Sequence, residues 1–221
     1  MVAEGVGTGL LLYVIVGSGI AAEQLGVDPA GQLLSHAVVV GLGLAALIAV
    51  FQTVSGSHFN PAVTIAFWRT TSLGGREGFG FIGAQLVGAV AGVALANFTF
   101  EIEILDISSN ARAGIGLTVA EAVATFVLVL AILMLVRTGR HGAVPAVVGA
   151  WVAAIVFATS STGFANPAVT IGRIFTDSYT GIAPASVAGF LIAQVIAGFA
   201  AASVAALLYR DSFEHETTRG D

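Results

Sequence analysis

The hexapeptide Asn-Pro-Ala-Val-Thr-Ile occurs twice in this chain, at 60–65 and at 166–171, and both copies lie between long apolar runs. Asparagine caps free backbone N–H groups at a helix start, and proline suits the first helical position because no N–H is needed there. Each copy therefore predicts a short helix that begins at its asparagine. A helix that starts inside a lipid bilayer must be enclosed by protein or line a wet cavity, because lipid offers its free backbone groups no partner.

The rest of the chain has the composition of an integral membrane protein. Hydrophobic residues make up 57% of the 221 positions, and charged residues only 10%. The apolar residues form stretches of about twenty, which is the length that spans a bilayer. Six stretches are found, near residues 2–21, 35–54, 79–100, 117–136, 143–160 and 184–209.

We expect the first stretch to be a retained span rather than a signal peptide, because no basic leader precedes it. The polar segment 211–221 is expected to be a mobile tail.

The positions of the arginines predict the orientation of the chain. All eight cationic side chains are arginines. If the N-terminus is cytoplasmic, only Arg112 and Arg173 face outward, and the others face the cytoplasm: Arg69, Arg76, Arg137, Arg140, Arg210 and Arg219. The excess of positive charge on the inner side favours cytoplasmic N- and C-termini in the cell membrane. No basic cluster suggests a nucleic-acid partner, and the absence of cysteine excludes disulfides and thiolate metal sites.

The two halves of the chain, approximately 1–110 and 111–210, resemble each other beyond the hexapeptide. The matching landmarks are 2–8 with 119–125, and Phe81, Ala84 and Gln85 with Phe190, Ala193 and Gln194. Each half has three spans, so the second half must enter the membrane from the opposite face, which makes the repeat inverted. We expect one domain over 1–221. The first half is eleven residues longer between its glutamate and its asparagine, and the extra residues fit best in a loop near 23–32.

The inverted repeat brings two helix N-termini together at the middle of the membrane. Each end carries about half a positive charge from the helix dipole. Asn60 and Asn166 can cap these helices through the side-chain oxygen and offer an amide N–H₂ to a passing solute. A water or hydroxyl that accepts from both amides is oriented, which opposes a continuous proton wire. We expect the dipoles to contribute more than this orientation to the exclusion of cations and protons.

The segment Ser57-His58-Phe59-Asn60-Pro61-Ala62-Val63-Thr64 resembles the signature of the aquaporin, or major intrinsic protein, family, and the resemblance extends over nearly the whole chain. It implies an all-α membrane protein with six tilted transmembrane helices, two re-entrant half-helices and a pore in each subunit of a homotetramer. The pore motifs would be Asn60, Pro61 and Ala62 with Asn166, Pro167 and Ala168.

The resemblance also implies roles for two buried glutamates and one histidine. Glu4 and Glu121 lie within apolar spans, where an ionisable group is costly and is a functional candidate. In the family, such a glutamate accepts hydrogen bonds from the adjacent re-entrant loop. We favour this structural role over a proton relay, because the pair is symmetric and has no chain of ionisable neighbours. His58 is expected either to line the inner vestibule or to anchor its loop, with lining slightly favoured.

The chain departs from the family pattern at the narrow outer filter. Water-selective and many glycerol-permeable members place an arginine directly after the second Asn-Pro-Ala, where this chain has Val169. Spacing from the motifs puts the other filter positions at Val40, Ala154 and Gly163. All four are small and apolar, so we expect a wide constriction with few hydrogen-bond donors. Arg173, four residues beyond Val169, is expected to reach outward or bond a carbonyl instead of lining the constriction.

The second motif, from Asn166 to Asp177, also resembles a bacterial branch associated with arsenic resistance, which likewise lacks the filter arginine. This resemblance suggests that neutral metalloid hydroxides such as arsenous acid pass. Glycerol is comparable in size and in its number of hydroxyl groups.

The leading functional hypothesis is a passive channel for water and small neutral solutes, without a cofactor and without enzymatic activity. An orthodox water channel is one alternative. A secondary transporter is less favoured, because the predicted midplane offers amides and helix N-termini rather than ion-carrying groups. A structural junction protein would need a longer adhesive loop. The four histidines are too scattered to indicate a metal or nucleophile site.

Overall fold

The structure is a computed structural model that describes residues 1–70 and 73–217, with side chains described as far as residue 208. The described residues form ten helical elements. In chain order they are α1 (Val2–Gln24), α2 (Pro29–Ser55), α3 (Pro61–Thr70), α4 (Gly75–Thr99), α5 (Ile115–Arg137), η1 (His141–Ala143), α6 (Val144–Ala158), α7 (Pro167–Gly172), η2 (Arg173–Phe175) and α8 (Pro184–Thr217). The all-α fold predicted from the sequence is confirmed.

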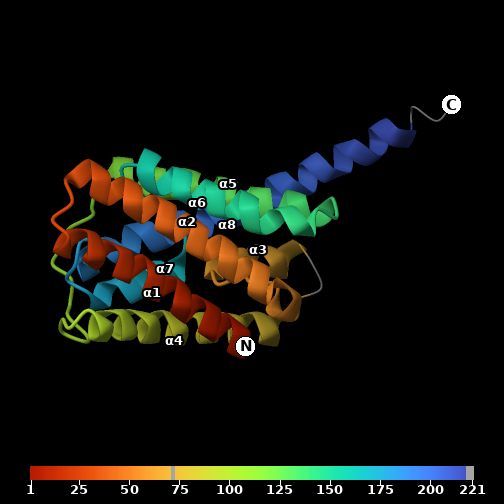
Figure 1. Cartoon of the computed structure of the whole chain (residues 1–221). Helices are drawn as coiled ribbons and strands as arrows, with labels where there is room; N and C mark the ends of the chain where they lie inside the picture. The colour runs from red at the N-terminus through yellow and green to blue at the C-terminus, as the bar shows by residue number, and fades with distance from the viewer. Residues whose placement is uncertain (71–72, 218–221) are drawn as a thin grey trace.

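Six helices of the described chain are long and apolar enough to cross a membrane. They are α1, α2, α4, α5, η1 with α6, and α8, and each corresponds to one of the six predicted apolar stretches. Figure 1 shows them as a bundle around two short helices, α3 and α7. The chain is therefore a multi-pass membrane protein with six spans and two half-helices.

The loop predicted near 23–32 is shorter than expected: only 25–28 connects α1 and α2, and the other residues of this range lie in these two helices. Helix α2 has 27 residues, whereas its counterpart α6 has 15. The earlier start has a local cause: the Asp28 carboxylate accepts hydrogen bonds from the backbone N–H groups of Ala30 and Gly31, and Pro29 occupies the first helical position. The connection between α1 and α2 is thus reduced to four residues, 25–28.

The last helix continues beyond the predicted span. Helix α8 runs to Thr217, so most of the segment predicted as a polar tail is helical. Figure 1 shows this end of α8 standing out from the bundle. Its side chains beyond residue 208 and the whole of 218–221 lie outside the described residues, so the predicted mobility stays a prediction.

Small residues allow the first and fourth helices to pack closely. A side chain at Gly88 or Gly92 of α4 would collide with the backbone carbonyls of Gly5 and Gly9 of α1. Helix backbones approach this closely in lipid only where side chains are absent or minimal. The contact fixes α1, which carries Glu4, against α4, which carries Gln85.

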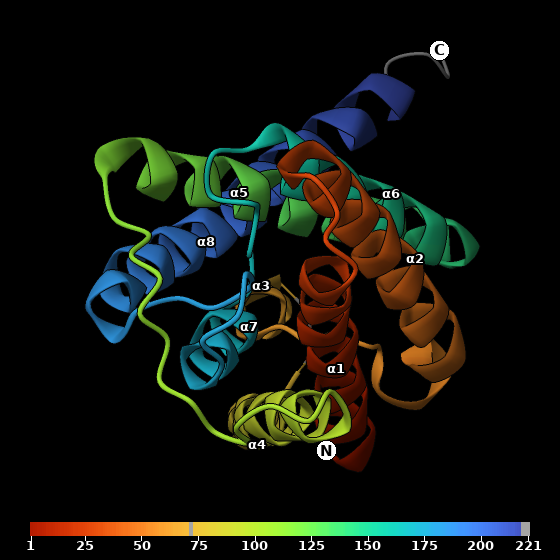
Figure 2. The same ribbon diagram turned by 60° about the vertical axis from the view of Figure 1, so that its left-hand side comes forward.

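The two half-helices begin near each other and run in opposite directions. Figures 1 and 2 show α3 and α7 inside the bundle, surrounded by the long helices. Helix α7 runs toward the end of the bundle that carries the connections 25–28, 100–114 and 176–183, which we call the loop end. Helix α3 runs toward the opposite end, which carries the N-terminus and which we call the terminal end (Figure 1).

Candidate functional site

The asparagines of the two motifs cap the half-helices as predicted. The Asn60 side-chain oxygen accepts a hydrogen bond from the Ala62 backbone N–H at 2.9 Å. The Asn166 oxygen accepts from the N–H groups of Ala168 at 2.9 Å and of Val169 at 3.3 Å. Both side chains are buried, and both line one cavity at the centre of the bundle.

Each asparagine also bonds the opposite re-entrant loop, a contact that was not predicted from the sequence. The Asn60 amide nitrogen donates to the Ala165 carbonyl at 2.7 Å, and the Asn166 amide nitrogen donates to the Phe59 carbonyl at 2.8 Å. Phe59 and Ala165 both adopt left-handed backbone conformations, with φ of 46° and 47°. Such a conformation costs a non-glycine residue about 1–3 kcal/mol, so the surrounding bonds must hold it. An amide has two N–H groups, so each asparagine keeps one for a solute.

Glu4 supplies part of this support in the first half. One of its carboxylate oxygens accepts from the Ser55 hydroxyl at 2.6 Å and from the His58 N–H at 3.0 Å. The other accepts from the Phe59 N–H at 2.7 Å and from the Gln85 amide at 2.8 Å. The carboxylate thus holds the backbone directly before Asn60.

Glu121 has the same arrangement in the second half. Its oxygens accept from the N–H groups of Phe164 and Ala165, both at 2.8 Å, and from the Gln194 amide at 2.6 Å. Glu4 and Glu121 are completely buried. Because these bonds occupy both oxygens of each carboxylate, the geometry supports a structural role rather than a proton relay.

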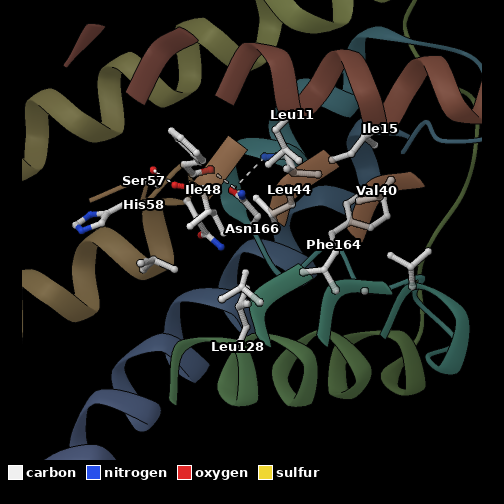
Figure 3. Close-up of a pocket in the computed structure, with 18 of the residues that line it drawn as sticks. Leu11, Ile15, Val40, Leu44, Ile48, Ser57, His58, Leu128, Phe164 and Asn166 are labelled. Atoms are coloured by element: carbon white, nitrogen blue, oxygen red, sulfur yellow. Dashed lines mark hydrogen bonds between the residues drawn. The ribbon is translucent and has the colours of Figure 1, made fainter. Parts of the chain in front are cut away.

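The cavity runs past both asparagines and is lined by four long helices and both re-entrant segments. The helices contribute branched apolar side chains at intervals of four residues, which forms a stripe on each helix. The stripes are Leu11 and Ile15 on α1; Val40, Leu44 and Ile48 on α2; Leu128 and Ile132 on α5; and Val148, Val152 and Val156 on α6. Figure 3 shows Leu44 and Ile48 beside Asn166. The re-entrant segments supply most of the polar side chains, among them Ser57, Asn60, Thr162 and Asn166.

Three of the four predicted filter positions lie on this cavity, and one does not. Val40, Gly163 and Val169 line it. Ala154 is exposed on the outside of α6, while Val152 and Val156 face the cavity. The assignment of Ala154 is therefore wrong. Two residues correspond to about 200° around a helix, so an error of two in register moves the side chain to the opposite face.

Two polar residues of the cavity lie one helical turn toward the loop end from the predicted filter. His36 precedes Val40 by four residues, and Arg173 follows Val169 by four. Arg173 is only 3% exposed and lines the cavity, so of the two alternatives the outward-reaching side chain is wrong. It does bond a carbonyl, that of Thr180, as expected. The spacing of four residues from Val40 and from Val169 is the sequence signal for both positions.

The connection 100–114 crosses the loop end and fixes the segment around Arg173. The Ser108 N–H donates to the Ile174 carbonyl at 2.8 Å, and the Asn110 amide donates to the Ser178 carbonyl at 2.6 Å. The Arg112 guanidinium donates to the carbonyls of Gly181 and Tyr179, each at 2.8 Å. Burial lowers the pKa of Arg112 and raises the pKa of Tyr179 from their ordinary values. Both shifts reflect the limited access of water to these groups.

His58 lines the cavity and also anchors its loop, so the two predicted alternatives occur together. Its backbone N–H bonds Glu4, and its ring nitrogen Nδ1 lies 3.1 Å from the Thr64 hydroxyl. The ring packs against Phe67 with 4.6 Å between centroids. His58 also contacts a second hollow at the terminal end, so it stands between the cavity and that opening.

Comparison with known proteins matches residues 1–165 to the family described as Major intrinsic protein. The chain is 41% identical over 195 residues to Aquaglyceroporin AqpS of Rhizobium meliloti (strain 1021), covering 88% of this chain and 83% of that protein. It is 29% identical over 231 residues to Aquaporin AqpM of Methanothermobacter thermautotrophicus, covering 95% and 91%. It is 34% identical over 146 residues to the Glycerol uptake facilitator protein of Escherichia coli (strain K12), covering 61% and 51%.

Proposed function

Because the chain belongs to the major intrinsic protein family of membrane channels, which are not enzymes, we propose that it conducts water and small neutral polyhydroxylated solutes passively. Glycerol and metalloid hydroxides such as arsenous acid are the solutes we propose. The observation that carries the proposal is the cavity that passes Asn60 and Asn166 and is lined both by apolar stripes of the long helices and by polar groups, mostly from the re-entrant segments. The similarity to an aquaglyceroporin and to a glycerol uptake facilitator supports the same solute class.

The lining of the cavity suits a solute that has both polar and apolar groups. Glycerol carries hydroxyl groups along a carbon chain, so its hydroxyls can bond the asparagine amides while its carbons contact the valine and leucine stripes. Each hydroxyl leaves water on entry and needs a replacement partner, because an unpaired polar group in an apolar site is costly. The free N–H of each asparagine amide provides one at the centre of the path.

The layer of Val40, Gly163, Val169 and Val152 favours solutes larger than water. These residues have short side chains or none, and their side chains offer no hydrogen-bond donor to a passing solute. We propose that these residues form the part of the filter that admits the largest solutes. Val152 takes the place predicted for Ala154. A trihydroxylated arsenic species is comparable with glycerol in size and hydroxyl count, so the layer does not separate the two.

Cations are excluded by charge in this proposal. The N-termini of α3 and α7 both face the cavity centre, and each carries about half a positive charge. The guanidinium of Arg173 adds a further positive group on the same path. Passive flow of neutral solutes without ion leakage follows.

We propose that the loop end faces outward, with cytoplasmic termini, in the cell membrane. The arginines of the terminal end outnumber those of the loop end, as the positive-inside rule requires. We also propose that 1–221 is one domain and that four copies assemble as a homotetramer, as in the family resemblance. In this assembly each subunit keeps its own channel.

Stopped-flow light scattering of proteoliposomes tests the function. Vesicles with the purified chain should take up water, glycerol and arsenous acid faster than empty vesicles, without saturation and without dependence on a proton gradient. Val152→Trp should block all three fluxes, because residue 152 lies on the cavity. Ala154→Trp is the matched control, since residue 154 faces away from it. Flux that saturates and follows a proton gradient would instead indicate a secondary transporter.

A further inference from the structure

We propose that Arg173 and His36 form a solute-recognition layer at the loop end of the channel and that this layer binds the hydroxyl groups of small neutral polyhydroxylated solutes. The inference rests on the proposed function and deepens it. It places the hydrogen-bonding part of the filter one helical turn away from the apolar layer of Val40 and Val169.

Two elements bring the layer together. Helix α2 starts at the loop end, so His36 lies one turn closer to that end than Val40. Helix α7 runs toward the loop end, so Arg173 lies one turn beyond Val169 in the same direction. One turn is about 5.4 Å along a helix. Both side chains line the cavity, and both are almost fully buried in the protein, at 2% and 3% exposed.

The guanidinium of Arg173 retains donors for a ligand. Its Nε donates to the Thr180 carbonyl, and its carbon Cζ lies 3.4 Å from the centre of the Phe164 ring. Within the described residues, the two terminal nitrogens have no hydrogen-bond partner and no carboxylate forms an ion pair with them. A buried guanidinium without a carboxylate is costly unless its remaining N–H groups find acceptors. Molecules in the channel are therefore the available acceptors.

Arg112, at the same end, differs from Arg173 in its hydrogen bonding. Its Nε and both terminal nitrogens are used, by the carbonyls of Gly181 and Tyr179 and, at 3.5 Å, by the Thr162 hydroxyl. Its bonds hold the crossing connection in place, whereas two nitrogens of Arg173 are left free. The two arginines predicted to face outward thus differ in what they can bind.

His36 supplies the complementary acceptor. Its Nδ1 lies 2.7 Å from the Ser18 hydroxyl, which itself donates to the Ile15 carbonyl at 3.0 Å. With the Ser18 hydroxyl donating to the Ile15 carbonyl, we assign the ring proton to Nδ1, which leaves Nε2 as an acceptor. A solute hydroxyl both accepts and donates, so it matches Arg173 as donor and His36 as acceptor. A metal cation or an ammonium group would match only the histidine and would be repelled by the arginine.

The internal repeat shows that the stacked contact on this ring can form without a charge. Arg173 follows Asn166 by seven residues, and Phe67 follows Asn60 by seven. In the first half, Phe67 packs on the ring of His58, and in the second half Arg173 packs on the ring of Phe164. The same stacked pair therefore forms without an arginine at the terminal end. The positive charge of Arg173 has no counterpart at Phe67 in the first half, and solute recognition accounts for it.

The test compares the ratio of glycerol to water permeability in proteoliposomes. Arg173→Met keeps the length of the side chain and removes its donors, so glycerol permeability should fall about fivefold or more, as for one lost hydrogen bond. Water permeability should change less than twofold, because water needs fewer bonds at once. Arg173→Lys should recover part of the glycerol flux, and Arg69→Met, an exposed arginine on α3, should change neither flux.

His36→Phe gives an independent variant in case Arg173→Met does not fold. It removes the acceptor while keeping a ring, and it should also lower the ratio of glycerol to water permeability. An unchanged ratio in the folded variants would overturn the recognition layer and leave the channel function standing. Absence of solute flux in the wild-type protein would instead overturn the proposed function.

Discussion

Asn60 and Asn166 hold each other's loops: the amide of each donates to the carbonyl of the residue directly before the other. The same two side chains cap the half-helices through their oxygens. Each asparagine is therefore at once a cap, a cross-link between the two halves of the chain, and a donor toward the cavity. One residue type serves all three because its side chain carries both an acceptor and two donor hydrogens.

Asn166→Asp separates these roles. Aspartate still caps α7, but it cannot donate to the Phe59 carbonyl and places a negative charge against that oxygen. We expect the free energy of unfolding to fall by about 1–3 kcal/mol and cation exclusion to weaken. Denaturant unfolding in detergent measures the first effect, and cation currents across bilayers measure the second. Unchanged stability would mean that the cross-link contributes little.

Replacing the buried glutamates should show that their carboxylates organise the loops. In Glu121→Gln, one carboxylate oxygen becomes an amide that opposes the N–H of Phe164 or Ala165. The expected cost is about 1–3 kcal/mol, with a loss of both water and glycerol flux. Glu4→Gln should cost more, because Glu4 accepts from four donors. Glu77→Gln, on the exposed face of α4, serves as the control. Normal stability with loss of proton-dependent flux alone would favour a relay.

Periodic features of the fold were predictable because each comes from a repeated local pattern. The six spans follow from apolar length, and the two half-helices follow from an Asn-Pro start at 60 and at 166. The bonds between each asparagine and the opposite loop were not predictable. They join residues about a hundred positions apart and depend on left-handed backbone at Phe59 and Ala165, residue types that do not favour it.

The filter shows where spacing arguments lose accuracy. Val169 belongs to the half-helix that the second motif begins, and Val40 is separated from the first motif by the short irregular segment 56–60; both line the cavity. Ala154 lies on α6, which is joined to the second motif by the irregular segment 159–166, so its rotation could not be counted from the motif. Arg173 was expected either to reach outward or to bond a carbonyl, and spacing from the motif could not decide between the two. Its stacking on Phe164 and its bond to Thr180 keep it inside.

Val169→Arg tests the apolar layer. The new guanidinium would fill part of the cavity one turn from Arg173 and add donors where the wild type has none. Glycerol and arsenous acid fluxes should fall much more than water flux, because the path narrows. Val169→Leu, which narrows the path less and adds no donor, should give an intermediate loss for the larger solutes. An equal loss of all three fluxes in stopped-flow measurements would count against the placement of the filter at Val169.

Gly88→Ala tests the close packing of α1 against α4. A methyl group at residue 88 would overlap the Gly5 carbonyl, and the backbone cannot move aside as a flexible side chain could. The helices must separate, which should cost about 1–3 kcal/mol, as overpacking does elsewhere. The displacement would also move Glu4, so flux should fall with stability. Gly83→Ala on the same helix is the matched control, because no atom lies within 4 Å of the added carbon. Equal melting temperatures for the two variants would show that α1 and α4 are less tightly packed than the structure indicates.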